Sequence, residues 1–296
     1  LLDFIGQAKN STFSLHAAIY ELHTPEGKPW SDVLAALRTA KQAGAKVSLI
    51  YDANGDTGAD NTTAIDEAQI KGISIGRTNA NLMHNKFIVL SKNNKPVAVW
   101  TGSTNISRNA LYGQLNFGHV VRNEEVAKRY LAYWEQLKDD PEPDVLKDWT
   151  EAENALPPAD DSDEILPIFS PHRGAEVFKW WIKLASGNVP LFMTFPFGIV
   201  KDFRPVFDKS DGVLRFALLD KYVNGGNKQS REAAIADIER IRRRPNIGMA
   251  LGHRIKVDWI DGWHKELDAI GLNVNWIHTK FMLIDPLGNK PVTLAG

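Results

Sequence analysis

The sequence predicts a mixed α/β fold built as two related halves, and three observations lead to it. Segments patterned as strands alternate with helical segments along most of the chain. The stretch at residues 84–102 recurs at residues 278–296. The composition, 43% hydrophobic and 24% charged, is that of an ordinary globular protein. We therefore expect two lobes with mixed sheets, related by a pseudo-twofold axis.

The first half is expected to alternate strands with helices. Its first predicted helix has Ser31 as its cap and Gly44 near its end. Short apolar runs predict the strands, and helical spacing of apolar residues predicts the helices. The predicted strands are 13–20, 46–52, 83–91 and 96–102, and the predicted helices are 31–45, 61–72 and 124–138.

The second half shows a similar alternation. The helix predicted at 231–244 ends in a basic cluster, where cations are favourable beside the carbonyl end of a helix. The other predicted helices are 176–186 and 263–271, and the predicted strands are 189–195, 212–220, 275–285 and 291–296.

The acidic residues are unevenly distributed along the chain. Residues 1–164 carry a net charge of −7 and residues 165–296 a net charge of +6. Proline and aspartate concentrate at about residues 139–164, which predicts an exposed acidic linker with a solvated surface. We expect a first lobe at 1–155 and a second, C-terminally truncated lobe at 156–296. The chain begins with Leu and ends directly after a predicted strand, so we expect a segment of a longer protein.

The repeat carries the functional argument. HNKFIVLSKNNKPVAVWTG at 84–102 matches HTKFMLIDPLGNKPVTLAG at 278–296 in its His, Lys and Phe, in three following apolar residues and in NKPV. Residues i and i+2 of a strand share one face, so His84 is expected beside Lys86, and His278 beside Lys280. If the halves pack about a twofold axis, these four side chains converge around one anion.

Two imidazoles and two ammonium groups suit the cleavage of a phosphodiester. The reaction needs a nucleophile on one side of phosphorus and a proton donor to the leaving oxygen on the other. Histidine serves both needs near neutral pH. The lysines, with Ser103 and Asn105 in TGSTNIS, would hold the nonbridging oxygens as charge develops. This scheme needs no metal ion and no cofactor.

These segments, with the paired His-x-Lys sequences and TGSTNIS, resemble the signatures of the phospholipase D superfamily, and bacterial phospholipase D-like domain proteins in particular. The resemblance implies a duplicated α/β/α sandwich with the active site at the lobe interface, and phosphodiester chemistry through a phosphohistidine. It implies His84 as nucleophile and His278 as general acid. Asp285 matches the acid of the family motif and is expected to orient or support the site, whereas Ser91 stands at that position in the first copy.

Some further residues are expected near the site. Many relatives carry a Glu close to the position of LNFGHVV, so Asn116 or His119 could line the pocket. We count Ser91, Ser103 and Asn116 as substrate-binding candidates. The second Ser-x-Asn of the family pattern is missing, because Gly296 aligns with Gly102.

The preferred function is a metal-independent phosphodiesterase, and phospholipid is favoured as substrate because the chain has no long basic tract. A nuclease is the alternative. IRRRPN at 241–246, with Arg254 and Lys256, either binds nucleic-acid backbone or is a solvated helix end. The third hypothesis is a noncatalytic phosphate-binding or interaction module.

The expected partner is therefore a phosphodiester, either phospholipid or nucleic acid, and the oligomeric state is left open. No apolar run reaches the roughly 18 residues that would span a bilayer. We expect a soluble protein. The absence of cysteine fits either side of a bacterial membrane, and the cytoplasm is favoured.

Overall fold

The computed structural model describes residues 1–22, 32–80, 82–107, 109–158, 165–222, 226–252 and 276–296. The chain divides into two compact units. Unit 1 comprises Leu1–Leu111, Phe117–Leu156 and Glu164–Gly174, and unit 2 comprises Tyr112–Asn116, Pro157–Asp163 and Ala175–Gly296. The boundaries of the predicted lobes as independent domains stay a prediction.

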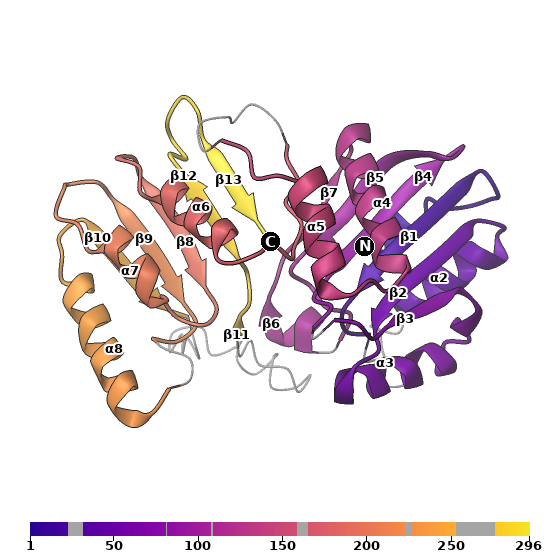
Figure 1. The fold of residues 1–296 in the computed structure, drawn as a ribbon, viewed down its shortest axis with the longest axis horizontal. Coiled ribbons are helices and arrows are strands. Elements are labelled where there is room, and N and C mark those ends of the chain that lie inside the picture. The colour runs from indigo at the N-terminus through magenta and orange to yellow at the C-terminus, as the bar shows by residue number, and fades with distance from the viewer. Residues whose placement is uncertain (23–31, 81, 108, 159–164, 223–225, 253–275) are drawn as a thin grey trace, which may run out of the picture. The chain divides into compact units, whose positions relative to one another are not determined.

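Unit 1 is an α/β structure with one mixed sheet (Figure 1). Its strands are β1 (Phe13–Ile19), β2 (Lys46–Asp52), β3 (Ser74–Arg77), β4 (Lys86–Lys92), β5 (Lys95–Gly102) and β7 (Gly118–Val121). Its helices are α1 (Leu2–Ile5), α2 (Asp32–Gln42), α3 (Gly55–Glu67), α4 (Glu124–Lys138) and α5 (Pro143–Glu153). A 3-10 turn at Lys71–Ile73 and a π-helical turn at Asn109–Gly113 also occur.

The sheet of unit 1 has the strand order β3-β2-β1-β4-β5-β7. Strands β1, β2 and β3 run parallel, and β4 is antiparallel to both β1 and β5. Every residue of β4 from Lys86 to Ser91 is buried, as expected for a central strand covered on both faces. The N-terminal residue of this strand is therefore a buried lysine.

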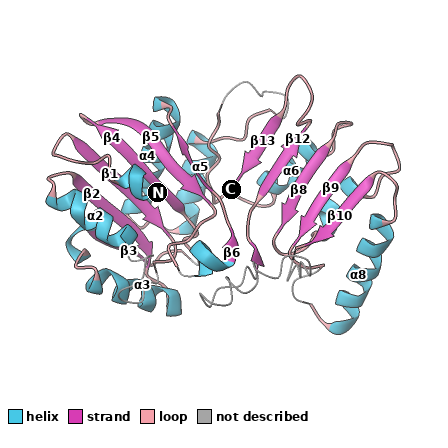
Figure 2. Ribbon diagram, turned by 180° about the vertical axis from the view of Figure 1, so that it is seen from behind, coloured by secondary structure: helices cyan, strands magenta, loops and turns pink. Residues whose placement is uncertain are grey.

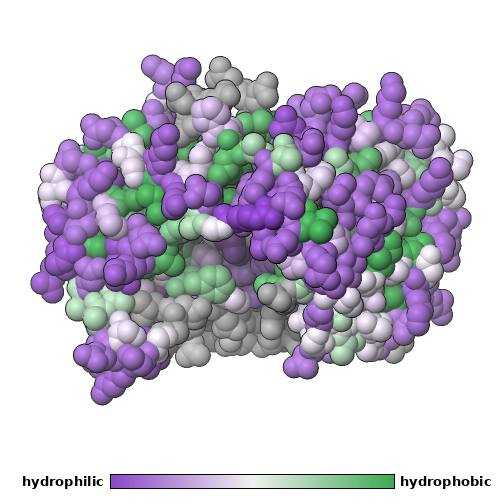
Figure 3. All heavy atoms as spheres, viewed as in Figure 1, coloured by the Kyte–Doolittle hydropathy of each residue, from purple (hydrophilic) through white to green (hydrophobic). Residues whose placement is uncertain are grey.

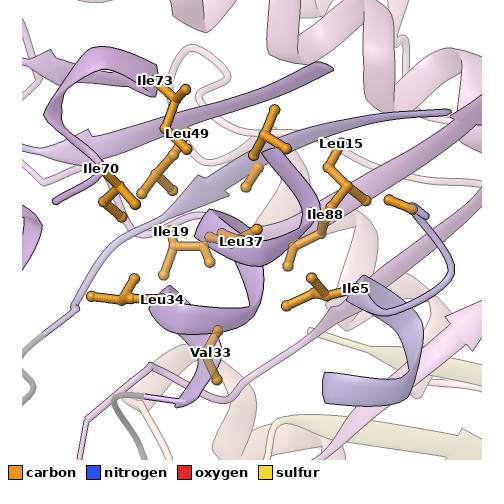
Figure 4. Close-up of a cluster of buried hydrophobic side chains, with 14 of the residues drawn as sticks. Ile5, Leu15, Ile19, Val33, Leu34, Leu37, Leu49, Ile70, Ile73 and Ile88 are labelled. Carbon is orange, nitrogen blue, oxygen red and sulfur yellow. The ribbon is translucent and has the colours of Figure 1, made fainter. Parts of the chain in front are cut away.

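Helices cover both faces of the unit 1 sheet. On one face, Ile5 of α1 and Leu34 and Leu37 of α2 pack against Leu15 and Ile88 of the sheet (Figure 4). On the other face, helices α4 and α5 pack against the sheet through a second cluster of buried residues. Each fully buried Leu or Ile contributes roughly 1.5–3 kcal/mol to folding. The predicted three-layer α/β/α sandwich is confirmed for unit 1.

Unit 2 repeats this plan with a five-stranded sheet (Figure 2). Its strands are β6 (Gln114–Leu115), β8 (Leu191–Phe195), β9 (Arg215–Leu219), β10 (Ile247–Leu251), β11 (Trp276–Ile277), β12 (Phe281–Ile284) and β13 (Val292–Ala295). Its helices are α6 (Glu176–Ala185), α7 (Arg204–Phe207) and α8 (Lys228–Arg242), with a 3-10 turn at Lys201–Phe203. Strands β6 and β11 form a separate parallel pair.

The two sheets share one topology. The order β10-β9-β8-β12-β13 in unit 2 matches β3-β2-β1-β4-β5 in unit 1, strand for strand. The directions agree as well, because β8, β9 and β10 are parallel and β12 is antiparallel to its two neighbours. The repeat read in the sequence is therefore a repeat of whole sheets.

The described helices of unit 2 pack against one face of its sheet. Phe203, Phe207 and Ile238 meet Leu219 and Met282 in this core. On the opposite face, Phe192 stacks on Phe216 at a ring-centroid distance of 4.7 Å, and Phe216 is 39% exposed. Helices on both faces are therefore described in unit 1 alone.

The acidic segment differs from its prediction. The linker expected at about 139–164 contains helix α5, whose Leu146 is buried in the second cluster of unit 1. Asp140 accepts hydrogen bonds from the backbone N–H groups of Thr78 and Asn79 and pairs with Arg77 at 3.2 Å. The amphipathic spacing of residues 143–153 and these ties order this part of the segment. Residues 159–164 lie outside the described residues.

One predicted helix begins earlier in the structure than expected. The helix expected at 61–72 runs from Gly55 to Glu67, so Asn61 lies within it and is fully buried. The helix predicted at 263–271 lies outside the described residues.

Candidate active site

Motif 1, residues 84–91, begins at the end of the sheet where β1 and β2 end. Asp52, the last residue of β2 and 1% exposed, accepts a hydrogen bond from the Met83 backbone N–H at 2.8 Å. Its other carboxylate oxygen accepts the Asn54 N–H at 2.8 Å. Asp52 therefore fixes the backbone one residue before His84.

The histidine and lysine of motif 1 meet through the backbone. β4 begins at Lys86, so His84 precedes the strand and is exposed. The Lys86 ammonium donates to the His84 carbonyl oxygen at 3.0 Å and lies 5.1 Å from the centre of the Tyr20 ring. The same ring lies 4.9 Å from the His84 imidazole. The prediction of two neighbours on one strand face is corrected to a lysine that folds back onto the preceding carbonyl.

The amide of Asn105 is held by a carboxylate that the sequence argument missed. Its Nδ2 donates to Glu21 Oε2 at 2.6 Å, and the Ile106 N–H donates to the Glu21 carbonyl at 2.9 Å. Ser103 Oγ accepts the N–H of Phe117 at 3.2 Å. Asn105 is oriented by Glu21, whereas Ser103 also anchors the loop after β5.

Asn61 connects the segments that carry these groups. Its Oδ1 accepts the Leu22 N–H at 2.7 Å, and its Nδ2 donates to the carbonyls of Tyr20 and Asp52, each at 2.8 Å. A single buried amide therefore holds the ends of β1 and β2 beside motif 1. No sequence signal distinguished Asn61 from a helix cap.

Motif 2, residues 278–285, repeats the same two ties in unit 2. Asp220, which follows β9 and is 3% exposed, accepts the Ile277 N–H at 2.9 Å. The Lys280 ammonium donates to the His278 carbonyl at 2.8 Å. Burial lowers the pKa of Lys280 to about 8. The aromatic neighbour is Trp276, whose ring lies 4.8 Å from the imidazole of His278.

The imidazole of His278 has a side-chain partner. Its Nδ1 lies 2.8 Å from Oδ1 of Asn116, and its backbone N–H donates to the Leu115 carbonyl at 3.1 Å. His278 is 4% exposed. Asn116, which the sequence suggested as a substrate-binding residue, is thus a neighbour of the motif 2 histidine.

The last residues of both motifs lie far from their histidines. A strand advances roughly 3.3 Å per residue, so Ser91 and Asp285 lie about 16 Å along the chain from the motif lysines. Ser91 is 2% exposed, and its Oγ is buried without a hydrogen-bond partner. Asp285 has a φ of 49° in the turn after β12, and its N–H donates to Pro190. This separation argues against direct phosphate contact by either side chain.

His119, the other candidate of LNFGHVV, lies on β7 opposite Thr101 of β5. Its ring stacks on Phe117 at 5.7 Å, and partial burial lowers the pKa of its imidazole.

The basic cluster at the end of α8 is largely paired with acids. Arg240 and Arg244 both bind Asp208, and Arg242 binds Glu239. These arginines compensate the acids around them, so the solvated helix end is the better of the two interpretations. The surface at α8 is correspondingly hydrophilic in Figure 3. Arg254 and Lys256 lie outside the described residues.

The fold and the two motifs define an α/β protein with duplicated His-x-Lys sites, and comparisons agree with this class. Residues 1–138 match the family model described as cardiolipin synthase, PLD-like domain. The predicted membership of the phospholipase D superfamily is confirmed, with the match in the first 138 residues. No curated protein matches the chain.

Solved structures share the fold over nearly the whole chain. Polyphosphate kinase from Porphyromonas gingivalis matches 99% of this chain with a TM-score of 0.58 at 12% identity. This chain spans only 42% of that kinase. Phosphatidylserine synthase from Haemophilus influenzae matches 96% of this chain, and 73% of its own, with a TM-score of 0.54 at 12% identity. These likenesses concern the fold alone.

In the part of the chain that the structure describes, none of the helices has the length and apolar character needed to cross a membrane.

Proposed function

We propose that the protein cleaves phosphodiesters through a phosphohistidine, with His84 and His278 serving the same reaction. The observation that carries the proposal is the repeated construction of the two motifs. In each, a lysine ammonium is held at the carbonyl of the motif histidine, and a buried aspartate fixes the preceding residue. Two copies of a preorganised cation beside an imidazole are what phosphoryl transfer requires.

The proposed reaction has two halves. In the first, Nε2 of His84 attacks phosphorus, the bond to the leaving oxygen breaks, and the leaving oxygen takes a proton from His278. In the second, His278 removes a proton from water, the resulting hydroxide attacks phosphorus, and the bond from phosphorus to His84 breaks. Each histidine ends in its starting protonation state, so the cycle closes without a co-reactant.

Three donors would stabilise the negative charge on the nonbridging oxygens. Lys86 and Lys280 supply positive charge, and Asn105 supplies an N–H. The amide nitrogen of Asn105 has two N–H groups, and Glu21 takes one of them. Glu21 would thereby turn the second N–H of Asn105 toward the substrate.

Phospholipid is the favoured substrate. The arginines of the α8 cluster are engaged by Asp208 and Glu239, which weakens the case for a nucleic-acid surface there. The matched family description names cardiolipin synthase, and one fold relative is a phosphatidylserine synthase. Both names concern phospholipid chemistry, which supports a lipid diester over DNA or RNA.

The test begins with the intermediate. The chain is incubated with ³²P-labelled bis(p-nitrophenyl) phosphate in EDTA, and His84→Ala and His278→Ala are compared with the native chain. We expect acid-labile, base-stable label to accumulate in His278→Ala, because the departing nitrophenolate needs no acid but hydrolysis needs the base. Label should be absent from His84→Ala. Label confined to His84→Ala would reverse the assignment, and no label in any chain would reject the covalent mechanism.

The second measurement asks whether both histidines serve one reaction. Each single substitution should remove essentially all steady-state turnover, whereas two independent sites would each leave part of it. Parallel assays with phosphatidylcholine and phosphatidylglycerol vesicles, single-stranded DNA and polyphosphate then assign the substrate class. We expect turnover of the lipid. Turnover of DNA alone would favour the nuclease, and turnover of none, with no label, the noncatalytic module.

A further inference from the structure

The strand pair β6 and β11 presents one side chain to the motif 2 histidine. Gln114 pairs with Trp276 and Leu115 pairs with Ile277, so the residue after β6 lies beside the residue after β11 (Figure 1). These two residues are Asn116 and His278. The N–H of His278 donates to the Leu115 carbonyl, which continues the pairing by one step.

The orientation of the Asn116 amide is set by a second hydrogen bond. Its Nδ2 donates to Gln114 Oε1 at 3.1 Å, so its Oδ1 is the atom that lies 2.8 Å from His278 Nδ1. An amide oxygen only accepts hydrogen bonds. Nδ1 of His278 must therefore carry the proton, and in the neutral ring Nε2 carries the lone pair.

We infer that Asn116 is a positioning residue that fixes the tautomer of His278, so that the proton exchanged in the reaction is exchanged at Nε2. The inference rests on the proposed function for its catalytic meaning. Whether the ring gives a proton to a leaving oxygen or takes one from water, one nitrogen must be committed elsewhere. Asn116 commits Nδ1, and it does so in both protonation states, because Nδ1 is protonated in both.

An amide differs from a carboxylate in this position because it carries no charge. Asn116 aligns the ring without stabilising the imidazolium, so it leaves the pKa of His278 to its other neighbours. The charged groups that face this segment are the Lys280 ammonium, held at the His278 carbonyl, and Asp220, which binds the preceding N–H. A carboxylate introduced at 116 would be a new charge against the ring itself.

The tautomer can be read without any enzyme assay. The full chain is labelled with ¹⁵N-histidine, and long-range ¹H–¹⁵N correlation spectra are recorded at a pH where the ring is neutral, with His278→Gln identifying the resonances. We expect protonated Nδ1 in the native chain and a mixture of tautomers in Asn116→Ala. Protonated Nε2 in the native chain, or an unchanged tautomer in Asn116→Ala, would overturn the inference.

Kinetics then separate positioning from a merely structural role. Asn116→Ala should lower kcat by about 10- to 100-fold with little change in KM, as for lost orienting partners of other histidines. Asn116→Asp keeps the acceptor, so it should recover most of kcat, and its charge should raise the pKa of His278 by about one to three units. An unchanged kcat in Asn116→Ala, or equal losses in both variants without a shift of the pH profile, would contradict the inference.

Two controls keep the outcomes distinct. Gln229→Ala removes an exposed amide on α8 and should change neither the spectra nor kcat. Thermal melting of Asn116→Ala identifies any loss of folding. If the native chain turns over no diester but shows protonated Nδ1 that depends on Asn116, the proposed function fails and the positioning role stands.

Discussion

The two motifs share their backbone restraints and differ in the surroundings of their imidazoles. In both, lysine binds the histidine carbonyl and an aspartate at the end of a parallel strand binds the preceding N–H. His84, however, is exposed beside a tyrosine, whereas His278 is buried beside an asparagine. The restraints common to both copies hold the cation, and the differences give the histidines separate tasks. An exposed imidazole suits attack on substrate, and an oriented one suits proton transfer.

The largest effect is expected from removing either cation. Lys86→Met and Lys280→Met should each lower kcat/KM by about 10²- to 10³-fold, because each lysine stabilises charge that develops on phosphate oxygens. Steady-state kinetics with a generic diester measure the two losses. Lys41→Met on the exposed side of α2 serves as the control and should behave like the native chain. A loss confined to one motif would show that the copies do not contribute alike.

The aspartates should contribute chiefly to stability. Asp52→Ala and Asp220→Ala should each lower the free energy of unfolding by about 2–3 kcal/mol, since each leaves a buried backbone N–H without its charged acceptor. Urea denaturation measures this loss. The Asn variants keep an oxygen acceptor and should lose less. Equal stabilities of Asp52→Ala and the native chain would break the parallel between the motifs.

The pH dependence should identify Lys280. Its pKa is lowered to about 8 by burial, so the ammonium is charged below pH 8 and neutral above it. With a nitrophenyl diester, whose leaving group needs no acid, kcat/KM should fall about tenfold for each pH unit above 8. Lys280→Arg should move this limb to higher pH, because the pKa of arginine lies above 12. A limb that does not move would assign the titration to another group.

Stability at the same residue changes with the opposite sign. The folded-state pKa of Lys280 is about 8 and lies below the usual value of 10.5, so the unfolded chain binds the proton more tightly between these values. This group therefore makes the fold more stable as pH rises through that window. Loss of activity above pH 8 together with rising stability would separate the titration from unfolding.

The smallest effect is expected where the motif sequences differ. Ser91→Ala should raise the free energy of unfolding by up to about 1 kcal/mol, because the buried hydroxyl loses no hydrogen bond. Ser91→Ala and Asp285→Asn should each keep kcat within about threefold of the native value, since both lie a strand length from the histidines. Chemical denaturation and kinetics check the pair. A large loss in Asp285→Asn alone would show that this acid acts through the strand.

The sequence predicted the repeated sheets well because their strands are short apolar runs with a recurring segment. It could not find Glu21 or Asn61, since each acts on residues brought near by the fold and neither belongs to a repeated pattern. Asp52 and Asp220 did leave a signal: KVSLIYD and RFALLD, the second parallel strands of the two halves, both end in aspartate. Comparing the halves outside the motif would have identified this pair.

The acidic segment shows the opposite limit. Its Pro and Asp content predicted exposure, but the spacing of Val145, Leu146 and Trp149 gives α5 an apolar face. Composition outweighed periodicity in the prediction, whereas burial of that face decides the structure.

The lysine that folds back onto its own motif carries a consequence for how such sites spread. The cation and the acceptor that restrains it lie within three consecutive residues, so a short duplicated segment brings its own geometry with it. Distant neighbours are then free to diverge between copies, as the exchange of a tyrosine for a tryptophan beside the imidazole illustrates. A duplicated gene could assign new duties to one half without rebuilding the charge that both halves need.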